Sequence, residues 1–437
     1  MLKAGLAAVD ITPPAGVRQG GYEGRTLPSL AVHDPLWARA LVLDDGIGRV
    51  GLVGLDLVSV PDVLLEEVRK SGSAYGVPGA SLLLAATHTH SGPDLRSDPA
   101  TDLEREYIES LPTRVGEAVQ RAVAGLAGVS LAIASGWSAV GINRRELVPG
   151  NTVTLGRNAF GPFDPELGVL RVADPAGRTV GVVMNYAAHA LCLGEDNYLI
   201  TADYPGHAVH YVEDRIGRGV TAIFFNGAAG DVNPREGPVY HGIWNGGSFL
   251  AAQHAGDALA TEAIRVLSEA EDLGDATIRC ASRKIQLPTN WERAINAAEA
   301  RLKGLEGRRA DPSYHFDRYL VWDQETESAE AARRHVERLK AQADKPVEME
   351  VQAIAVGDLA FVGWPGEVFC EFGKMVKRRS PFRRTYILGY ANGCVGYVPT
   401  LDAYRLGGYE VESAFHLADH AGTVLADESV SLLGTLT

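Results

Sequence analysis

The sequence predicts an α/β fold in which mixed β-sheets are covered by helices. Short apolar runs rich in β-branched residues, each ending in a small or polar residue, are typical of buried strands. Longer stretches between them place apolar residues at helical spacing. The two kinds of segment alternate over residues 1 to about 280, which is the pattern of folds whose helices pack on sheets.

The expected elements follow from these patterns in chain order. Buried strands are expected at 49–60, 81–88, 179–189 and 220–230, and helices at 103–126 and 246–270. Residues 290–345 are charged and helix-forming with few large apolar side chains, so we expect a helical hairpin inserted on the outside. Residues 347–367 predict a β-hairpin with a Gly-Asp turn. The sequence shows no internal repeat.

Composition and charge narrow the class of protein. The chain has 437 residues, of which 46% are hydrophobic, and a formal net charge of −14. Nucleic acid and anionic membranes repel such a chain, so we expect no nucleic-acid partner and no stable membrane insertion. The absence of an 18-residue apolar run and of a signal peptide favours the cytoplasm. Four widely spaced cysteines without a CxxC pair argue against a cysteine zinc site and a disulfide scaffold. The oligomeric state stays open.

Two histidines follow the apolar run that begins at Leu82. If the strand continues through them, His88 and His90 point the same way, because alternate side chains of a strand share one face. Two imidazoles on one face can both bind one cation, as pairs of histidines do in zinc sites. The alternative is two partly exposed histidines in a loop.

Two further strand ends carry possible metal ligands. His189 comes just past one expected strand, and Glu367 follows another after a Trp-Pro-Gly turn. Polar residues at the ends of several strands build sites in α/β folds. Each residue has a plainer interpretation, a hydrogen-bonded core histidine and a carboxylate at a helix N-terminus. Three histidines and one carboxylate at strand ends together predict a zinc shell.

Three other stretches carry polar groups. Asp231 and Asn233 follow a strand and a Gly-Ala-Ala-Gly turn, whose glycines would let the backbone approach a ligand. Tyrosines among the glycines of 390–412 are metal ligands, oxyanion donors or simple packing residues. His207 and His210 share a helical face, either as a solvated pair or as substrate contacts near the metal.

These stretches together resemble the neutral (non-lysosomal) ceramidase family of zinc amidases. The matching pieces occur in the family's order and are AVDITPP at 8–14, HTHSGP at 88–93, INRRE at 142–146, NYAAHA at 185–190, ADYPG at 202–206, GAAGDVNP at 227–234, WPGEVF at 364–369 and the segment 397–409. The resemblance implies an α/β catalytic domain with a single zinc ion. It implies as zinc ligands His88, His90, His189, Glu367 and Tyr397.

The resemblance also implies catalytic groups and a substrate site. Arg144 and Tyr409 fall on the residues that stabilise the transition state, although Arg145 lies beside Arg144 and the two could exchange roles. A surface salt bridge of these arginines to Glu146 or Glu410 is the plainer alternative. Asn233, His207 and Asp231 are the expected substrate-binding residues. A carboxylate is expected to orient each zinc-binding imidazole, with candidates Asp56, Asp203 and Asp231.

Two departures from the family concern the substrate. Asn233 stands where the family has serine, and we expect a single catalytic domain over 1–437 without the family's C-terminal immunoglobulin-like domain. We therefore expect a zinc-dependent hydrolase that uses water to cleave the amide bond of a small-molecule or amphipathic N-acyl substrate. A zinc esterase or lactonase on the same site, or a metal- or sugar-binding protein that has lost catalysis, are the alternatives.

Overall fold

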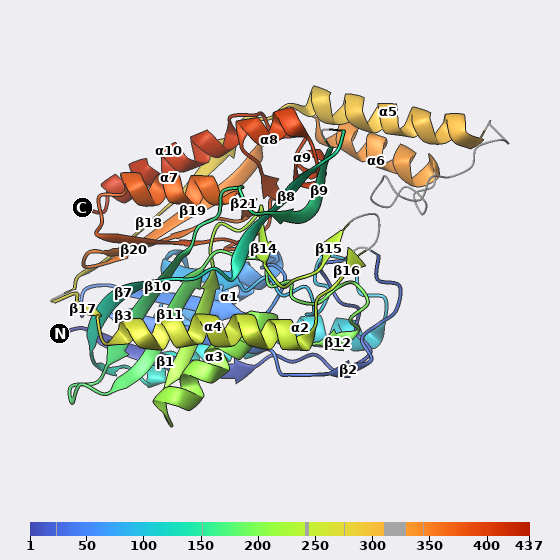
Figure 1. The fold of residues 1–437 in the computed structure, drawn as a ribbon. Coiled ribbons are helices and arrows are strands. Elements are labelled where there is room, and N and C mark those ends of the chain that lie inside the picture. Colours follow the sequence, from blue (N-terminus) through green and yellow to red (C-terminus); the bar gives the residue numbers. More distant parts are fainter. Residues whose placement is uncertain (23, 151, 241–243, 275, 310–328, 344) are drawn as a thin grey trace.

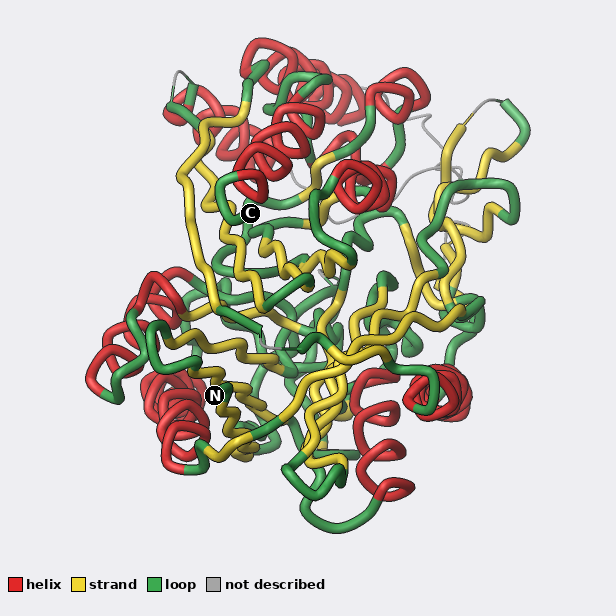
Figure 2. The backbone as a smooth tube through the Cα atoms, turned by 90° about the vertical axis from the view of Figure 1, so that its left-hand side faces the viewer, coloured by secondary structure: helices red, strands yellow, loops and turns green. Residues whose placement is uncertain are grey.

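The computed structural model describes all residues of the chain except 23, 151, 241–243, 275, 310–328 and 344. Its main sheets repeat one topology three times. In each unit three strands pair antiparallel in succession, a helix follows, a fourth strand pairs parallel to the third, and a second helix comes after it. The units lie side by side, with helices on the outside and strands within (Figures 1 and 2).

The bounds of the three units are as follows. The first contains β1 (Lys3–Asp10), β3 (Trp37–Asp44), β4 (Arg49–Leu55), α1 (Asp62–Ala74), β5 (Leu82–Ala86) and α2 (Asp102–Ala124). The second contains β7 (Ser130–Trp137), β10 (Glu166–Ala173), β11 (Thr179–Tyr186), α3 (Asp203–Ile216), β13 (Thr221–Asn226) and α4 (Phe249–Leu267). The third contains β18 (Ile278–Leu287), β19 (Val347–Val356), β20 (Leu359–Gly363), α7 (Cys370–Arg379), β22 (Arg384–Leu388) and α10 (Ala421–Gly434).

The remaining elements are insertions and edge strands. Short strands β6 (Ala127–Gly128) and β17 (Glu271–Asp272) extend the first two sheets at their edges. Between units or within them lie β2 (Ala31–Val32), η1 (Gly79–Ser81), β8 (Gly141–Val148), β9 (Thr152–Asn158), β12 (Leu199–Ile200), β14 (Val232–Pro234), β15 (Val239–Tyr240), β16 (Trp244–Asn245), α5 (Trp291–Arg309), α6 (Ala329–Gln342), β21 (Glu367–Val368), β23 (Tyr397–Val398), α8 (Leu401–Leu406) and α9 (Tyr409–Ser413).

The core lies where the three sheets face one another. Leu41 of the first sheet, Leu170 of the second and Phe361 of the third are fully buried members of one central cluster. The other face of each sheet is covered by its own helices, so the strands are apolar on both sides. Burial of each large side chain stabilises the folded state by about 1.5–3 kcal/mol. Because both faces of these strands are covered, their residues are apolar at successive positions, and the strands appear in the sequence as continuous apolar runs.

The predicted fold class is confirmed. The structure has mixed parallel and antiparallel sheets covered by helices, and α5 and α6 form the expected hairpin between β18 and β19. In Figure 1 this hairpin projects from one end of the molecule. Residues 310–328 of the predicted insertion lie outside the described residues. The expected β-hairpin at 347–367 is also present, as β19 and β20.

The three units share a topology although the sequence shows no internal repeat. The expected strand ends need correction, because the strands end earlier than predicted. β5 ends at Ala86 and β11 at Tyr186, so their histidines lie in the loops beyond them. In each unit the third and fourth strands are parallel, as β4/β5, β11/β13 and β20/β22. The loops that follow these two strands therefore leave the sheet at the same edge.

Candidate metal centre

The first two histidines converge because of the loop backbone and not because of the strand pleat. His88 is two residues beyond β5 and has a positive φ of 66°, which bulky residues rarely adopt. This turn brings the Nε2 atoms of His88 and His90 to 3.1 Å from each other. The two imidazoles therefore meet, as expected from the sequence, but for a different physical reason.

The other two predicted donors reach the same point from the second and third units. His189 lies three residues beyond β11, and its Nε2 atom is 3.1 Å from Oε2 of Glu367. The same carboxylate oxygen lies 3.4 Å from Nε2 of His88. Glu367 begins β21, which pairs parallel to β23 and so sets Glu367 beside Tyr397. Gly230 permits this approach, since a Cβ there would lie 2.2 Å from the carbonyl oxygen of Glu367.

Backbone carbonyls orient the imidazoles, whereas the sequence analysis expected carboxylates. His88 Nδ1 is 2.6 Å from the carbonyl oxygen of Val58, and His189 Nδ1 is 2.8 Å from that of Ala229. His90 Nδ1 has no hydrogen-bond partner among the described residues. Because a carbonyl oxygen can only accept, Nδ1 of His88 and of His189 must carry the proton, which leaves each Nε2 with a lone pair.

The three candidate carboxylates bind backbone amides instead. Asp56 accepts a hydrogen bond from the Trp37 amide at 2.9 Å, and Asp203 accepts one from the Tyr204 amide at 2.7 Å. Asp231 accepts bonds from the Cys370 amide at 2.8 Å and from Asn143 Nδ2 at 3.0 Å. Burial raises the pKa of all three carboxyls to about 6.

The four donor groups fit a metal ion. His88, His90, His189 and Glu367 are buried, and the three imidazoles form a group whose ligand atoms all lie within 4.8 Å of one another. Ligand atoms about 2.0–2.1 Å from a tetrahedral zinc are roughly 3.3 Å apart. The closest separations here, 3.1 and 3.4 Å, agree with that spacing. A cation between these atoms would bind the Nε2 lone pairs of His88 and His189 together with the carboxylate of Glu367.

The protonation of the cluster also favours metal binding. Burial lowers the pKa of His90 well below its usual range and that of His189 to about 4, with smaller effects from neighbouring positive groups. Burial alone would raise the pKa of Glu367, but His88 and His189 beside it hold the pKa well below its usual range. Neutral imidazoles and an ionised carboxylate are the forms that bind metals.

Arg144 enters the site, and Arg145 does not. Arg144 Nη1 lies 3.0 Å from His189 Nε2, and its Nη2 donates to the hydroxyl of Tyr397 at 2.9 Å. Arg145 turns away and donates to the carbonyl of Gly407 at 2.6 Å. Both arginines bind Glu410, at 2.8 Å from Arg144 Nε and 2.5 Å from Arg145 Nη1.

This ion-pair cluster is buried, whereas the sequence analysis considered a salt bridge at the surface. Glu410 is completely buried and Arg144 nearly so. Burial would raise the pKa of Glu410, but the two guanidinium charges lower it. From the sequence, Glu410 is expected only as a possible surface partner of these arginines. Its position next to Tyr409 is the signal that could have drawn attention to it.

Asn233 does not line the pocket over the cluster, but its Oδ1 accepts a hydrogen bond from Arg144, which does, at 3.2 Å. The rings of Tyr397 and Tyr409 meet edge to face at 5.5 Å. Asp231 and His207 do not line the pocket over the cluster either. His207 lies on α3 and faces α4, where a Cβ on Gly256 would approach it to 2.5 Å. His210 is exposed beside Asp214.

A small pocket of about 50 Å³ opens over the donor atoms. Its lining residues are Gly21, Tyr22, Val58, His88, His90, Arg96, Arg144, Leu155, Leu191, Glu367, Tyr397 and Tyr409. The N-terminal part of this wall was missed by the sequence analysis. Gly21 has φ +96° and passes so close to His90 that a Cβ would lie 2.5 Å from its ring. Tyr22 contacts the same ring edge to face at 5.1 Å.

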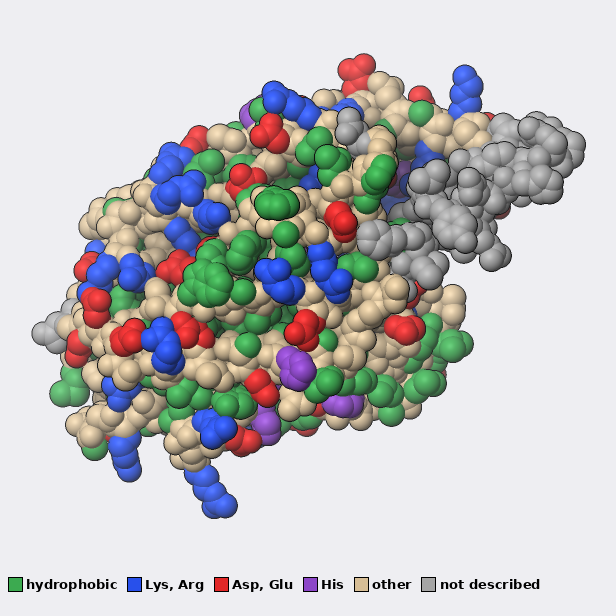
Figure 3. Space-filling model, in the orientation of Figure 1, with side chains coloured by type: hydrophobic (Ala, Val, Ile, Leu, Met, Phe, Trp, Pro, Cys, Tyr) green, Lys and Arg blue, Asp and Glu red, His purple; other side chains and the backbone are tan. Residues whose placement is uncertain are grey.

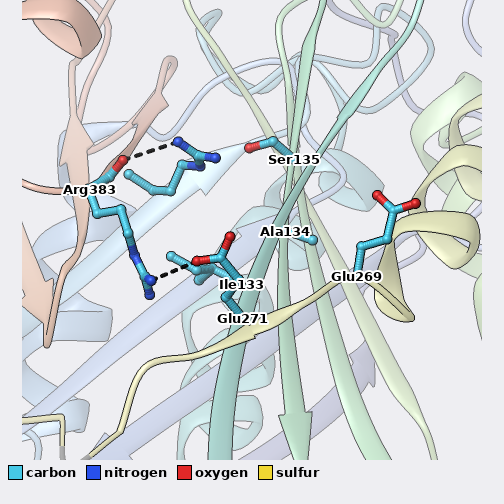
Figure 4. A pocket seen from close by; sticks show the side chains of 7 residues that line it. Ile133, Ala134, Ser135, Glu269, Glu271 and Arg383 are labelled. Atoms are coloured by element: carbon cyan, nitrogen blue, oxygen red, sulfur yellow. Dashed lines mark hydrogen bonds and ion pairs between the residues drawn. The ribbon is translucent and has the colours of Figure 1, made fainter.

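A larger pocket of about 410 Å³ lies elsewhere, between β7 and the start of β22 (Figure 4). Its acidic groups are already paired. Arg383 binds Glu271 at 2.8 Å, as the dashed line in Figure 4 shows, and Glu269 binds Arg265 at 2.7 Å. Acidic and basic side chains are also interspersed on the face drawn in Figure 3. The volume of a pocket therefore does not identify the metal site. The converging nitrogen and oxygen atoms of the donor residues identify it instead.

The chain also resembles known proteins in sequence and in fold. Residues 2–246 match the family model described as neutral/alkaline non-lysosomal ceramidase, N-terminal. The chain is 24% identical to a neutral ceramidase of Mycobacterium tuberculosis over 470 residues, which cover 94% of this chain and 73% of that protein. It is 28% identical to a neutral ceramidase of Pseudomonas aeruginosa over 248 residues, covering 53% of this chain and 36% of that protein.

Solved structures show the same fold. A neutral ceramidase from Pseudomonas aeruginosa matches with a TM-score of 0.72 at 21% identity, over all of this chain and 75% of that one. A structure described as a ceramidase complexed with C2 matches with a TM-score of 0.74 at 21% identity, over the same shares. Among the described residues, no helix is long and apolar enough to cross a bilayer.

Proposed function

Since this chain belongs to the neutral/alkaline non-lysosomal ceramidase family, we propose that it is a zinc-dependent hydrolase that cleaves the amide bond of an N-acyl compound. The observation that carries the proposal is the convergence of His88, His90, His189 and Glu367, with lone pairs facing one another, beside the guanidinium of Arg144. Relatives named neutral ceramidases support an amide as the scissile bond.

The chain's own donors would hold the zinc. His88, His90, His189 and Glu367 supply three nitrogens and an oxygen, and Tyr397, paired with Glu367 across β21 and β23, is the proposed fifth ligand. When bound, zinc lowers the pKa of water to about 7 and polarises a carbonyl oxygen. The carbonyl oxygens of Val58 and Ala229 hold the imidazoles in the tautomer that presents Nε2 to the metal.

Arg144 and Tyr409 would stabilise the negative charge that forms when water attacks the amide carbonyl. Glu410 binds Nε of Arg144 and thereby holds the guanidinium with its two Nη groups toward the site. Tyr409 lines the same pocket and contacts Tyr397. A donor that is in place before the reaction acts only when the charge develops, so it should affect kcat more than KM.

A matched panel of substrates tests the proposal. Metal-free protein is loaded with one equivalent of zinc and offered an N-acyl amide, the corresponding ester and a lactone. We expect amide hydrolysis that a chelator abolishes and zinc restores. Preferential turnover of the ester or lactone would support the alternative enzyme class, and stoichiometric zinc binding without turnover of any compound would support a binding protein.

The tyrosine is tested in the same assay. Tyr409→Phe should lower kcat by about 10²–10³-fold with little change in KM, because one oxyanion donor is lost. Tyr211→Phe, in a partly buried residue of α3 that does not line the pocket, serves as the matched control and should leave both constants unchanged. An unchanged kcat in Tyr409→Phe would remove this phenol from the mechanism.

A further inference from the structure

Arg96 is a cation in the wall of this pocket whose guanidinium has no ion-pair partner among the described residues. It lies in the loop between β5 and α2, is exposed, and lines the same small pocket as His88 and Glu367. Its backbone amide donates to Asp94 Oδ1 at 3.0 Å, but its guanidinium makes no hydrogen bond or ion pair with any described residue. The five donors of this group are therefore available to a ligand.

The loop that carries Arg96 is braced on both sides. Glu104 of α2 accepts hydrogen bonds from the Ala100 amide at 2.7 Å and from Arg18 Nε at 2.9 Å. Arg18 in turn donates to the carbonyl of Asp98 at 2.7 Å. Burial works against the ionised form of Glu104, but its bonds with Arg18 and Ala100 lower its pKa to about 2. A loop held in this way presents Arg96 from a fixed backbone.

The donors of the other arginine of the pocket already have partners. Nε of Arg144 binds Glu410, and its Nη groups donate to Tyr397 and Asn233. These bonds hold Arg144 at the reaction centre. Arg96 is therefore the pocket arginine whose guanidinium donors have no partner among the described residues.

We propose that Arg96 binds a carboxylate carried next to the scissile amide, so that N-acyl amino acids are the preferred substrate class. This inference rests on the proposed amide hydrolysis. A guanidinium matches a carboxylate in a two-point hydrogen-bonded pair, which also fixes its orientation. Arg96 lines the same pocket as His88 and Glu367, so a carboxylate bound there belongs to the part of the substrate next to the reacting carbonyl. The amine half of an N-acyl α-amino acid carries its carboxylate in this position.

Two matched substrates test the proposal in the zinc-loaded protein. N-lauroylglycine and N-lauroylethanolamine differ in whether a carboxylate or a hydroxyl ends the short amine half. We expect a higher kcat/KM for N-lauroylglycine, and Arg96→Gln should lower that constant by about 10–100-fold while leaving the neutral substrate nearly unchanged. Arg105→Gln, an exposed arginine paired with Asp102 outside the pocket, is the control and should change neither.

The outcomes separate this inference from the proposed function. Equal or better turnover of the neutral amide, together with no effect of Arg96→Gln, would overturn the role of Arg96 and leave amide hydrolysis intact. If neither amide is hydrolysed, the proposed function fails, and calorimetric binding of N-lauroylglycine to the unreactive protein then decides the role of Arg96. Binding that weakens in Arg96→Gln supports it, and absent or unchanged binding contradicts it.

Discussion

Two buried charged clusters meet in this protein, and they differ in whether their atoms satisfy one another. The donor cluster consists of His88, His90, His189 and Glu367, and the arginine cluster of Arg144, Arg145 and Glu410. In the arginine cluster both guanidinium groups donate to acceptors, because both bind Glu410 and Arg145 also donates to the carbonyl of Gly407. In the donor cluster three ring nitrogens and a carboxylate oxygen converge, and the one donor beside them, Nη1 of Arg144, reaches only His189. A convergence of acceptor atoms, rather than burial or charge alone, therefore identifies the place for a cation.

Removing a donor should have the largest effect. His189→Ala takes away a nitrogen from the centre of the cluster, so we expect zinc content to fall well below one equivalent and activity to fall by at least about 10³-fold. The large sheet core should keep the variant folded, unlike a zinc finger. Elemental analysis and circular dichroism measure the two effects. His210→Ala, exposed on α3, is the control, and full zinc content in His189→Ala would contradict the assignment.

Breaking the arginine cluster should act on stability rather than on metal content. Glu410→Gln leaves two buried guanidinium groups without a counter-charge, which typically costs about 3–5 kcal/mol of unfolding free energy. Urea unfolding measures this loss. Glu117→Gln breaks an exposed pair with Arg121 and should cost less than about 1 kcal/mol. If Glu410→Gln lowered the unfolding free energy as little as Glu117→Gln does, the buried ion pairs of the arginine cluster would not stabilise the fold.

The donor cluster should also make the unfolding free energy depend on pH. The pKa of His189 is about 4 in the folded protein and about 6.5 in an unfolded chain. Between these values the unfolded chain binds more protons, so stability falls as the pH drops from about 6.5 to about 4, by roughly 3 kcal/mol for this group. Urea unfolding of metal-free protein across this range should show the loss. His189→Asn should flatten the curve, and an unchanged slope would contradict the shift.

The smallest effect is expected at Tyr390, which sharpens the contrast with His88. Both residues lie two positions beyond the fourth strand of their units, both have positive φ, and their rings stack at 3.9 Å. The Tyr390 hydroxyl is buried without a partner among the described residues. Tyr390→Phe should therefore keep zinc and activity and change the unfolding free energy by no more than about 1 kcal/mol. Loss of zinc in this variant would show that the Tyr390 hydroxyl helps to hold the metal.

The stack of His88 and Tyr390 shows that equivalent positions carry different chemistry. A residue with positive φ stands two positions after β5 and after β22, whereas Ala228, at the same point after β13, is not among the residues with positive φ. The shared topology therefore does not fix the loop conformation, and the side chain at that point differs between the units.

The sequence by itself determined where the reactive residues lie along the chain. Apolar runs predict buried strands through local patterning, so the positions of His88, His189 and Glu367 at or just beyond strand ends followed without a structure. The strand-end positions could be predicted because hydrophobic periodicity is a local property of the chain. Arg144 and Tyr409 were indicated by the family motifs instead, and their catalytic roles stay a prediction.

Only the tertiary structure decided how these residues face one another. Arg144 and Arg145 are neighbours in sequence, and their division of roles depends on Glu410, more than 260 positions away. The carbonyl of Val58, rather than any carboxylate, orients His88. Such pairings arise because β-sheet topology brings distant loops together, and the direction of a side chain there depends on loop dihedral angles and on long-range hydrogen bonds, which residue spacing does not encode.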